Sequence, residues 1–98
     1  MGWKMLESKL QAEIIRWLRS KGFYVIKHSV VAGVPVGTAD LSFYYEGFYG
    51  FIEVKASKNS RLQPLQREFI EKMNSWSWAR LVSPDNWKEV KLEIEQML

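Results

Sequence analysis

The sequence contains no cysteine, a single histidine and only three prolines in 98 residues. Without cysteine, the chain can form neither a disulfide framework nor a thiolate zinc site. No apolar run reaches the roughly 18 residues that a membrane span needs. The first residues turn charged within a few positions, and the apolar h-region of a signal peptide is absent. These absences predict a cytoplasmic protein that does not enter a membrane.

The composition is rich in apolar and aromatic residues. Hydrophobic residues make up 47% of the chain and aromatic residues 14%, which is more than a small domain easily buries. We therefore expect one domain over residues 1–98, with a surface left for self-association. The net charge is +3, from 14 Lys and Arg against 11 Asp and Glu, which is compatible with a polyanionic partner such as nucleic acid.

The spacing of apolar residues predicts an α/β domain. Glu46-Gly47 is short enough to join two strands as a tight hairpin. Pro64 suits the first turn of a helix, and Ser83-Pro84 indicates an N-cap followed by proline at the first helical position. We expect helices over about 5–20, about 64–74 and from 83 to the C-terminus, and strands over 23–31, 40–45, 48–55 and 78–82. This order, αβββαβ with an extra C-terminal helix, predicts a mixed four-stranded sheet flanked by helices.

The predicted hairpin places three charged side chains on one face of the sheet. A two-residue turn at 46–47 sets Asp40 opposite Glu53, and Lys55, two residues further on, points the same way. Opposed carboxylates repel each other unless a cation lies between them. Mg²⁺ takes one or two carboxylates and keeps its other positions for water and phosphate. The alternatives are solvated charges at the end of a hairpin, or an Asp-Lys cross-strand pair.

Glu13 is a third candidate acid. It falls within the apolar stripe of the first helix, between Leu10 and Trp17. Buried acids are rare unless they are paired or bind a metal. The alternative is a glutamate at the edge of the stripe, which reaches water or pairs with Arg16 or Lys9.

Basic residues follow the predicted hairpin. Lys58, Arg61 and Arg67 border the candidate site and are placed to contact a phosphate backbone. A solvated loop explains Lys58 equally well. His28, the only histidine, is expected to have a structural role; the alternative is a contact to phosphate or water near the candidate site.

Together these residues resemble the virus-type replication-repair nuclease (VRR-NUC) family of the PD-(D/E)xK nuclease superfamily. The likeness runs from Glu13 to about Val82. It rests, in order, on Glu13, Gly-Thr-Ala-Asp40, Phe-Ile-Glu53-Val-Lys55 and Leu-Gln-Pro-Leu-Gln66. The family often has proline where this chain has Ala39. For that departure we expect altered stiffness of the loop rather than lost activity.

The resemblance implies a restriction-endonuclease-like fold and a role for each matching residue. Lys55 would position or activate the attacking water, and Gln66 would orient the water or Lys55. The ion would be Mg²⁺ or Mn²⁺. The implied metal ligands are Glu13, Asp40, Glu53 and the backbone carbonyl of Val54.

The implied activity is hydrolysis of DNA phosphodiester bonds. Small members of the family resemble Holliday-junction resolvases, which predicts a homodimer that cuts branched DNA in phage-type replication or repair, in a prokaryotic or phage-infected cell. One alternative is a homing or restriction endonuclease that reads a specific sequence. The other is a non-catalytic nucleic-acid-binding module on the same fold.

Overall fold

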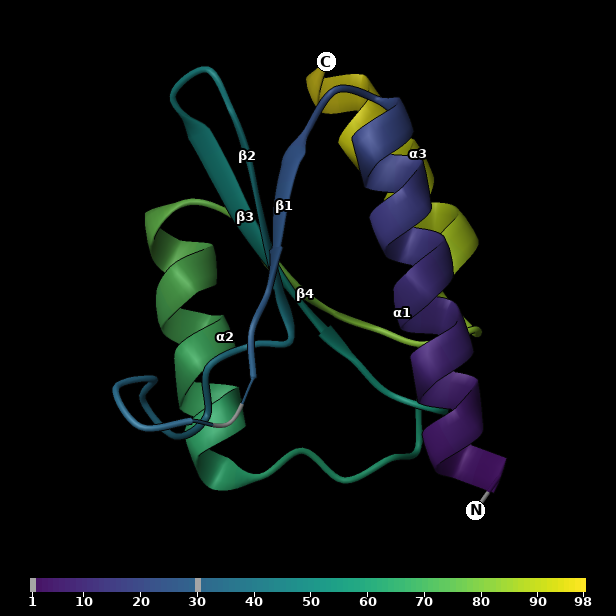
Figure 1. Ribbon diagram of the computed structural model, residues 1–98, viewed down its shortest axis with the longest axis vertical. Helices are drawn as coiled ribbons and strands as arrows, with labels where there is room; N and C mark the ends of the chain where they lie inside the picture. The colour runs from purple at the N-terminus through teal and green to yellow at the C-terminus, as the bar shows by residue number, and fades with distance from the viewer. Residues whose placement is uncertain (1, 30) are drawn as a thin grey trace.

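The computed structural model describes residues 2–29 and 31–98. Its four strands form one sheet in the order β1-β2-β3-β4, and helices α1 and α3 lie on one face while α2 lies on the other (Figure 1). The first three strands are antiparallel and β3 pairs with β4 in parallel. The predicted mixed sheet flanked by helices is therefore confirmed. The elements are α1 (Gly2–Ser20), β1 (Tyr24–Lys27), β2 (Leu41–Tyr45), β3 (Phe48–Val54), α2 (Pro64–Trp76), β4 (Ala79–Val82) and α3 (Trp87–Met97).

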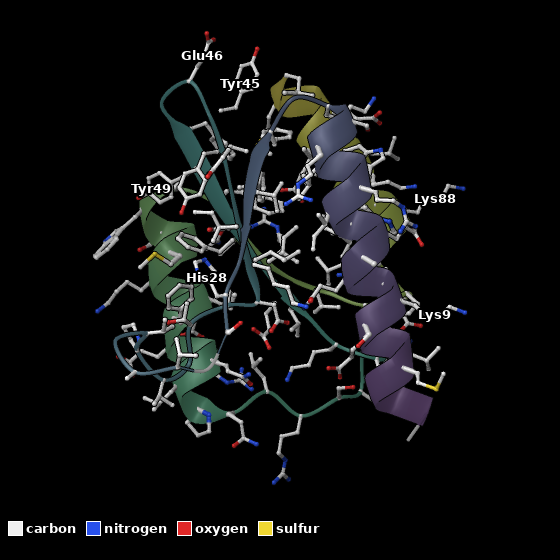
Figure 2. The ribbon with its side chains drawn as sticks, viewed as in Figure 1. Lys9, His28, Tyr45, Glu46, Tyr49 and Lys88 are labelled. Carbon is white, nitrogen blue, oxygen red and sulfur yellow. The ribbon has the colours of Figure 1, made fainter. Side chains whose placement is uncertain are left out.

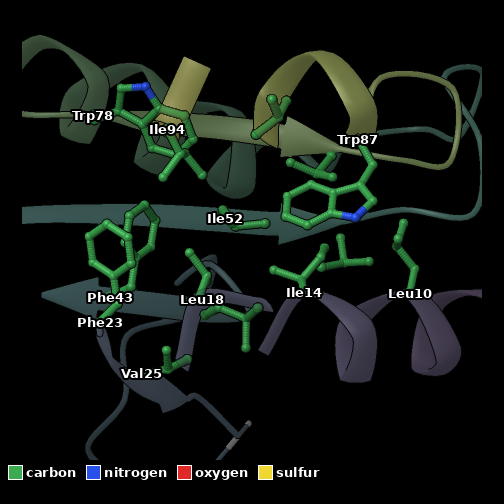
Figure 3. Close-up of a cluster of buried hydrophobic side chains, with 14 residues drawn as sticks. Leu10, Ile14, Leu18, Phe23, Val25, Phe43, Ile52, Trp78, Trp87 and Ile94 are labelled. Atoms are coloured by element: carbon green, nitrogen blue, oxygen red, sulfur yellow. The ribbon is translucent and has the colours of Figure 1, made fainter. Parts of the chain in front are cut away.

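The main core lies between the sheet and the pair α1 and α3 (Figure 3). Helix α1 buries Leu10, Ile14 and Leu18, which recur at the helical spacing seen in the sequence. Helix α3 adds Trp87, Val90 and Ile94 from the other end of the chain. Because these helices pack on the middle strands, the sheet is held firmly from one side.

Helix α2 covers the opposite face more thinly. None of the residues in Pro64–Trp76 is fully buried, and the main aromatic contact to the sheet is Phe69 against Phe51, with ring centroids 5.1 Å apart. On β1, Tyr24 is 70% exposed. The α2 side of the sheet therefore keeps open surface beside the helix, and the acidic residues lie on this side.

The hairpin turn fixes the register of β2 and β3. Glu46 and Gly47 both have positive φ, 35° and 85°, as a two-residue turn that follows the twist of the strands requires. Tyr45 pairs with Phe48, and the register continues to Leu41 opposite Ile52. The predicted register is confirmed.

Two predicted boundaries are wrong. The first strand was expected to reach residue 31, but β1 ends at Lys27, and Val30 lies outside the described residues. Helix α3 begins at Trp87 rather than after Ser83. Ser83 instead starts a turn, in which the Trp87 N–H donates to the Ser83 carbonyl at 3.0 Å and the Asp85 N–H donates to the Ser83 hydroxyl at 3.3 Å. Serine and proline favour such turns as well as helix starts.

In the part of the chain that the structure describes, no helix combines the length and apolarity that crossing a membrane requires.

Gly50 allows Phe43 to pack against the sheet. A Cβ at Gly50 would lie 2.7 Å from Phe43 Cζ and 3.1 Å from Trp78 Cε3, and the two rings contact each other edge to face at 5.5 Å. We expect Gly50→Ala to destabilise the protein by about 1–3 kcal/mol, because both rings are buried and must shift. Thermal unfolding should show a Tm lower by about 4 °C or more. Gly2→Ala is the control, since no described atom lies within 4 Å of its added carbon. Equal midpoints for the two variants would contradict this packing.

Candidate active site

Asp40 and Glu53 meet where β2 begins and β3 ends. The Asp40 N–H donates to Glu53 Oε1 at 3.2 Å, and the Val54 N–H donates to Asp40 Oδ2 at 2.8 Å. Strand β2 begins at Leu41, so the two carboxylates take the place of backbone acceptors just beyond the paired residues. Each acid is thus held by the strand of the other. The predicted opposition of Asp40 and Glu53 is confirmed.

Burial raises the pKa of both acids. Glu53 is only 3% exposed. The Glu53 pKa is raised to about 7, mainly by burial and next by the negative charge of Asp40. The Lys55 ammonium and the Asp40 N–H lower this pKa, but by less. Burial also raises the pKa of Asp40, against the Val54 N–H and the positive charge of Lys55. The ionised forms of both acids are therefore costly in this site, and a bound cation would offset that cost.

Lys55 and Gln66 complete the group. The Lys55 ammonium lies 3.6 Å from Glu53 Oε2 and donates to Gln66 Oε1 at 3.4 Å. Gln66 Nε2 donates to Glu53 Oε2 at 3.0 Å, while Gln66 Oε1 also accepts the Gln63 N–H at 3.0 Å. Gln66 therefore ties the first turn of α2 to the acids. The four residues Asp40, Glu53, Lys55 and Gln66 form one connected set.

The donor set suits a hard divalent cation. Mg²⁺ usually binds one or two carboxylates and retains several waters, and Asp40 and Glu53 provide two carboxylates at one point. The Val54 N–H donates to Asp40, so the backbone of Val54 lies beside the two carboxylates. The Val54 carbonyl therefore stays a candidate ligand. Among residues 2–29 and 31–98, no three His, Cys, Asp or Glu side chains gather as a metal site. The structure thus supports a site with two acidic residues.

Glu13 does not join this group. It is exposed, and its carboxylate accepts the Trp87 indole N–H at 3.0 Å. It lines a separate hollow together with Lys9 and Lys88, which lie on the helices away from α2 (Figure 2). Of the two sequence-based readings, the position at the edge of the stripe is the one observed, with Trp87 as the partner. A metal-binding role for Glu13 stays a prediction.

His28 and Lys27 adjoin the acids: the sequence offered this position for His28 only as the alternative to a structural role, and it gave no sign of it for Lys27. The His28 N–H donates to the Asp40 carbonyl at 2.8 Å, and its ring hydrogen-bonds the buried Ser42 hydroxyl at 2.8 Å. Lys27 is close enough to lower the pKa of Asp40. Figure 2 shows His28 on the α2 side of the sheet, far from the hairpin tip at Tyr45 and Glu46. This placement follows from the pairing of β1 with β2. The long loop between the two strands leaves their register unpredictable from the sequence.

The three predicted phosphate-binding residues line one basic hollow. Lys58, Arg61 and Arg67 surround a volume of about 740 Å³ beside the first turn of α2. The backbone N–H of Lys58 donates to Asp85 at 2.9 Å, which fixes the loop. The structure therefore gathers these cations next to Gln66, at one side of the acids.

Comparison with known proteins identifies a solved structure with the same fold. No protein-family model matches the sequence, and no curated protein matches it. A solved structure described as a VRR_NUC domain protein superposes on 90% of this chain and 86% of its own, with a TM-score of 0.66 and 23% sequence identity. The chain shares the VRR_NUC fold. This confirms the fold that the resemblance implied, and within the VRR_NUC fold the connected acids lie at the ends of the second and third strands.

The raised pKa of Glu53 predicts how stability depends on pH without metal. The folded protein holds the proton up to pH 7, whereas an unfolded glutamate releases it near 4.5. This contribution is therefore complete below 4.5 and is lost as the pH rises through about 7. Between pH 8 and pH 6, wild type should gain about 1 kcal/mol, or about 4–8 °C in Tm.

The measurement is thermal unfolding in chelator at both pH values, with Glu53→Gln as the comparison. Glu53→Gln should show a much smaller change, because it has no proton to bind at that position. A wild-type Tm that falls as the pH drops from 8 to 6 would show that Glu53 is ionised in the metal-free protein.

Proposed function

We propose that this chain is a metal-dependent endonuclease that hydrolyses phosphodiester bonds of DNA. The observation that carries the proposal is the connected set of Asp40, Glu53, Lys55 and Gln66. A buried glutamate and a half-buried aspartate, both with raised pKa, are joined to a half-buried ammonium by hydrogen bonds or an ion pair, and this arrangement has a cost in stability that a structural role does not require. The VRR_NUC fold supports the same assignment.

Asp40 and Glu53 would hold Mg²⁺ or Mn²⁺. A bound ion of this kind polarises a phosphoryl oxygen and lowers the pKa of a bound water. The protein contributes fixed carboxylates, because Val54 and the Asp40 backbone hold them in place before any ion binds. The ion would also remove the repulsion between the two acids.

Lys55 would act on the phosphate or on the attacking water. Its ammonium is held by Glu53 and Gln66, so its position is set by both the sheet and α2. A compact, fixed positive charge stabilises the negative charge that develops on the phosphoryl oxygens. Gln66 positions Lys55 and one Glu53 oxygen at the same time.

We propose branched DNA as the substrate and a homodimer as the active form. The basic hollow of Lys58, Arg61 and Arg67 provides contacts to the backbone without reading a sequence. One chain has one such site, so paired cuts across a junction need two copies related by a two-fold axis. The open face at Tyr24, where the apolar surface exceeds what α2 covers, supports self-association. Phage-type replication or repair is the setting that fits this activity.

The test is cleavage of labelled four-way junctions, flaps, single strands and linear duplexes, in Mg²⁺ and in Mn²⁺. We expect cleavage of the junction on two strands, and none in chelator. Lys55→Met should lower the rate at least about 100-fold, because one fixed positive charge is lost from the transition state. Lys72→Met, an exposed lysine of α2, is the matched control and should cut like wild type.

Two results would count against the proposal. If no DNA is cut with either ion, the chain is a binding module on this fold. If Lys55→Met and Lys72→Met cut equally fast, the active site lies elsewhere. Preferential cutting of one linear sequence would instead identify a sequence-specific endonuclease.

The basic hollow predicts a specific dependence on salt. Each phosphate contact that releases a counterion contributes about 0.9 to the log–log slope of affinity against salt for duplex DNA. Arg61→Ala should therefore flatten the slope by roughly one contact. Arg19→Ala, an exposed arginine in the last turn of α1, should leave it unchanged. Fluorescence anisotropy titrations from low to moderate salt measure both slopes. The same slope for Arg61→Ala and wild type would place Arg61 away from the DNA.

A further inference from the structure

A second hollow adjoins the acids on the side away from the basic residues. It has a volume of about 460 Å³ and lies between the 31–38 loop and the first turn of α2. This volume is within the ordinary range of small-molecule sites, about 300–1,000 Å³. Asp40 and Gln66 line it, so it opens directly onto the candidate active site. Its apolar lining residues are Val34, Pro35, Val36, Pro64 and Leu65.

The loop that forms one wall is held against the helix. Gly37 packs so closely on α2 that a Cβ there would lie 2.7 Å from the Leu65 backbone. The positive φ of Gly37, 92°, also suits glycine. Thr38 donates from both its hydroxyl and its backbone N–H to the Pro35 carbonyl, at 2.6 Å and 3.2 Å. The hollow is therefore part of the folded loop rather than a gap between unconnected segments.

The lining of this hollow does not suit a phosphate. Among its described residues none is Lys or Arg, whereas the basic hollow on the other side has three cations. The apolar part of a nucleic acid is the base, and apolar walls favour it over the charged backbone. Ser29, His28 and Gln63 add groups that can hydrogen-bond the edges of a base.

We infer that this hollow binds the base of an unpaired nucleotide next to the phosphate that is cut. The inference rests on the proposed nuclease function and names the feature of the substrate that the site recognises. In an intact duplex the bases are stacked and paired, so an unpaired base is the one that can enter. Val36 on the loop and Leu65 on the helix both line the hollow and would contact the base. The hollow therefore favours bulges, flaps and other DNA with an unpaired nucleotide over fully paired duplex.

The test is binding of a duplex with one bulged nucleotide. One duplex has 2-aminopurine as the bulged base, and the other has an abasic residue at the same position. Anisotropy titrations in Ca²⁺, a larger cation of the same charge as Mg²⁺, give the ratio of the two affinities. Wild type should bind the base-bearing duplex roughly fivefold tighter or more, because the base buries apolar surface against these walls. The 2-aminopurine fluorescence should change on binding.

The variants Val36→Asn and Leu65→Gln should bring this ratio close to one. Both positions are exposed in the free protein, 79% and 51%, so the substitutions should not unfold it. Leu92→Gln is the matched control, since Leu92 is 54% exposed on α3, on the other side of the sheet. It should keep the wild-type ratio.

The outcomes separate this inference from the nuclease function. A wild-type ratio of one, in a protein that cuts junctions, would overturn the inference and leave the nuclease. A ratio above fivefold that Val36→Asn and Leu65→Gln both preserve would also overturn it. A ratio that depends on these two residues, in a protein that cuts no DNA, would support the base site and reject the nuclease.

Discussion

The two hydrogen bonds from the Asp40 N–H to Glu53 and from the Val54 N–H to Asp40 are the interaction on which the candidate site depends. Opposed carboxylates roughly 5 Å apart repel by about 3 kcal/mol at most, at an effective dielectric near 20. A hydrogen bond to a charged acceptor contributes about 1.5–3 kcal/mol, and each acid accepts one from the strand of the other. These magnitudes are comparable, so the fold can hold the two acids together without an ion. The site is therefore formed before substrate or metal arrives.

The same acids also position helix α2. This helix buries no residue completely, so its place depends on side-chain contacts, among them Phe69 against Phe51 and Gln66 with Glu53 and Lys55. The polar contacts of the site thus contribute to the packing of the fold. On the proposed function, a change at Glu53 acts on catalysis and on the attachment of α2 at once, so the informative substitution is Glu53→Gln, which removes the charge and keeps the size.

The sequence predicted what short-range geometry decides and missed what long-range packing decides. The two-residue turn at 46–47 was enough to place Asp40 opposite Glu53, because strand pairing propagates from a tight turn. No such turn joins β1 to β2, so the register of these strands, and with it the contact of His28 with Asp40 and Ser42, could not be predicted by counting residues from a turn. The apolar stripe of α1 did not reveal that Glu13 reaches Trp87, 74 positions along the chain. Ser83-Pro84 fits a turn and a helix start equally well, and only the observed bonds distinguish them.

The first turn of α2 separates two environments of opposite character. Gln63 and Pro64 line both the basic hollow and the apolar one, and Gln66, one turn of helix further along, contacts Glu53. A nucleotide has the same division, with a charged phosphate at one end and a flat apolar base at the other. On the proposed function, phosphates of the strand lie toward Lys58, Arg61 and Arg67, and an unpaired base lies toward Val36 and Leu65. The scissile phosphate then lies at the boundary, where Asp40, Glu53 and Lys55 meet. A fully paired duplex can satisfy the basic side alone, whereas branched DNA with an unpaired nucleotide can satisfy both, so on the proposed function the division of charge across this turn favours such branched DNA.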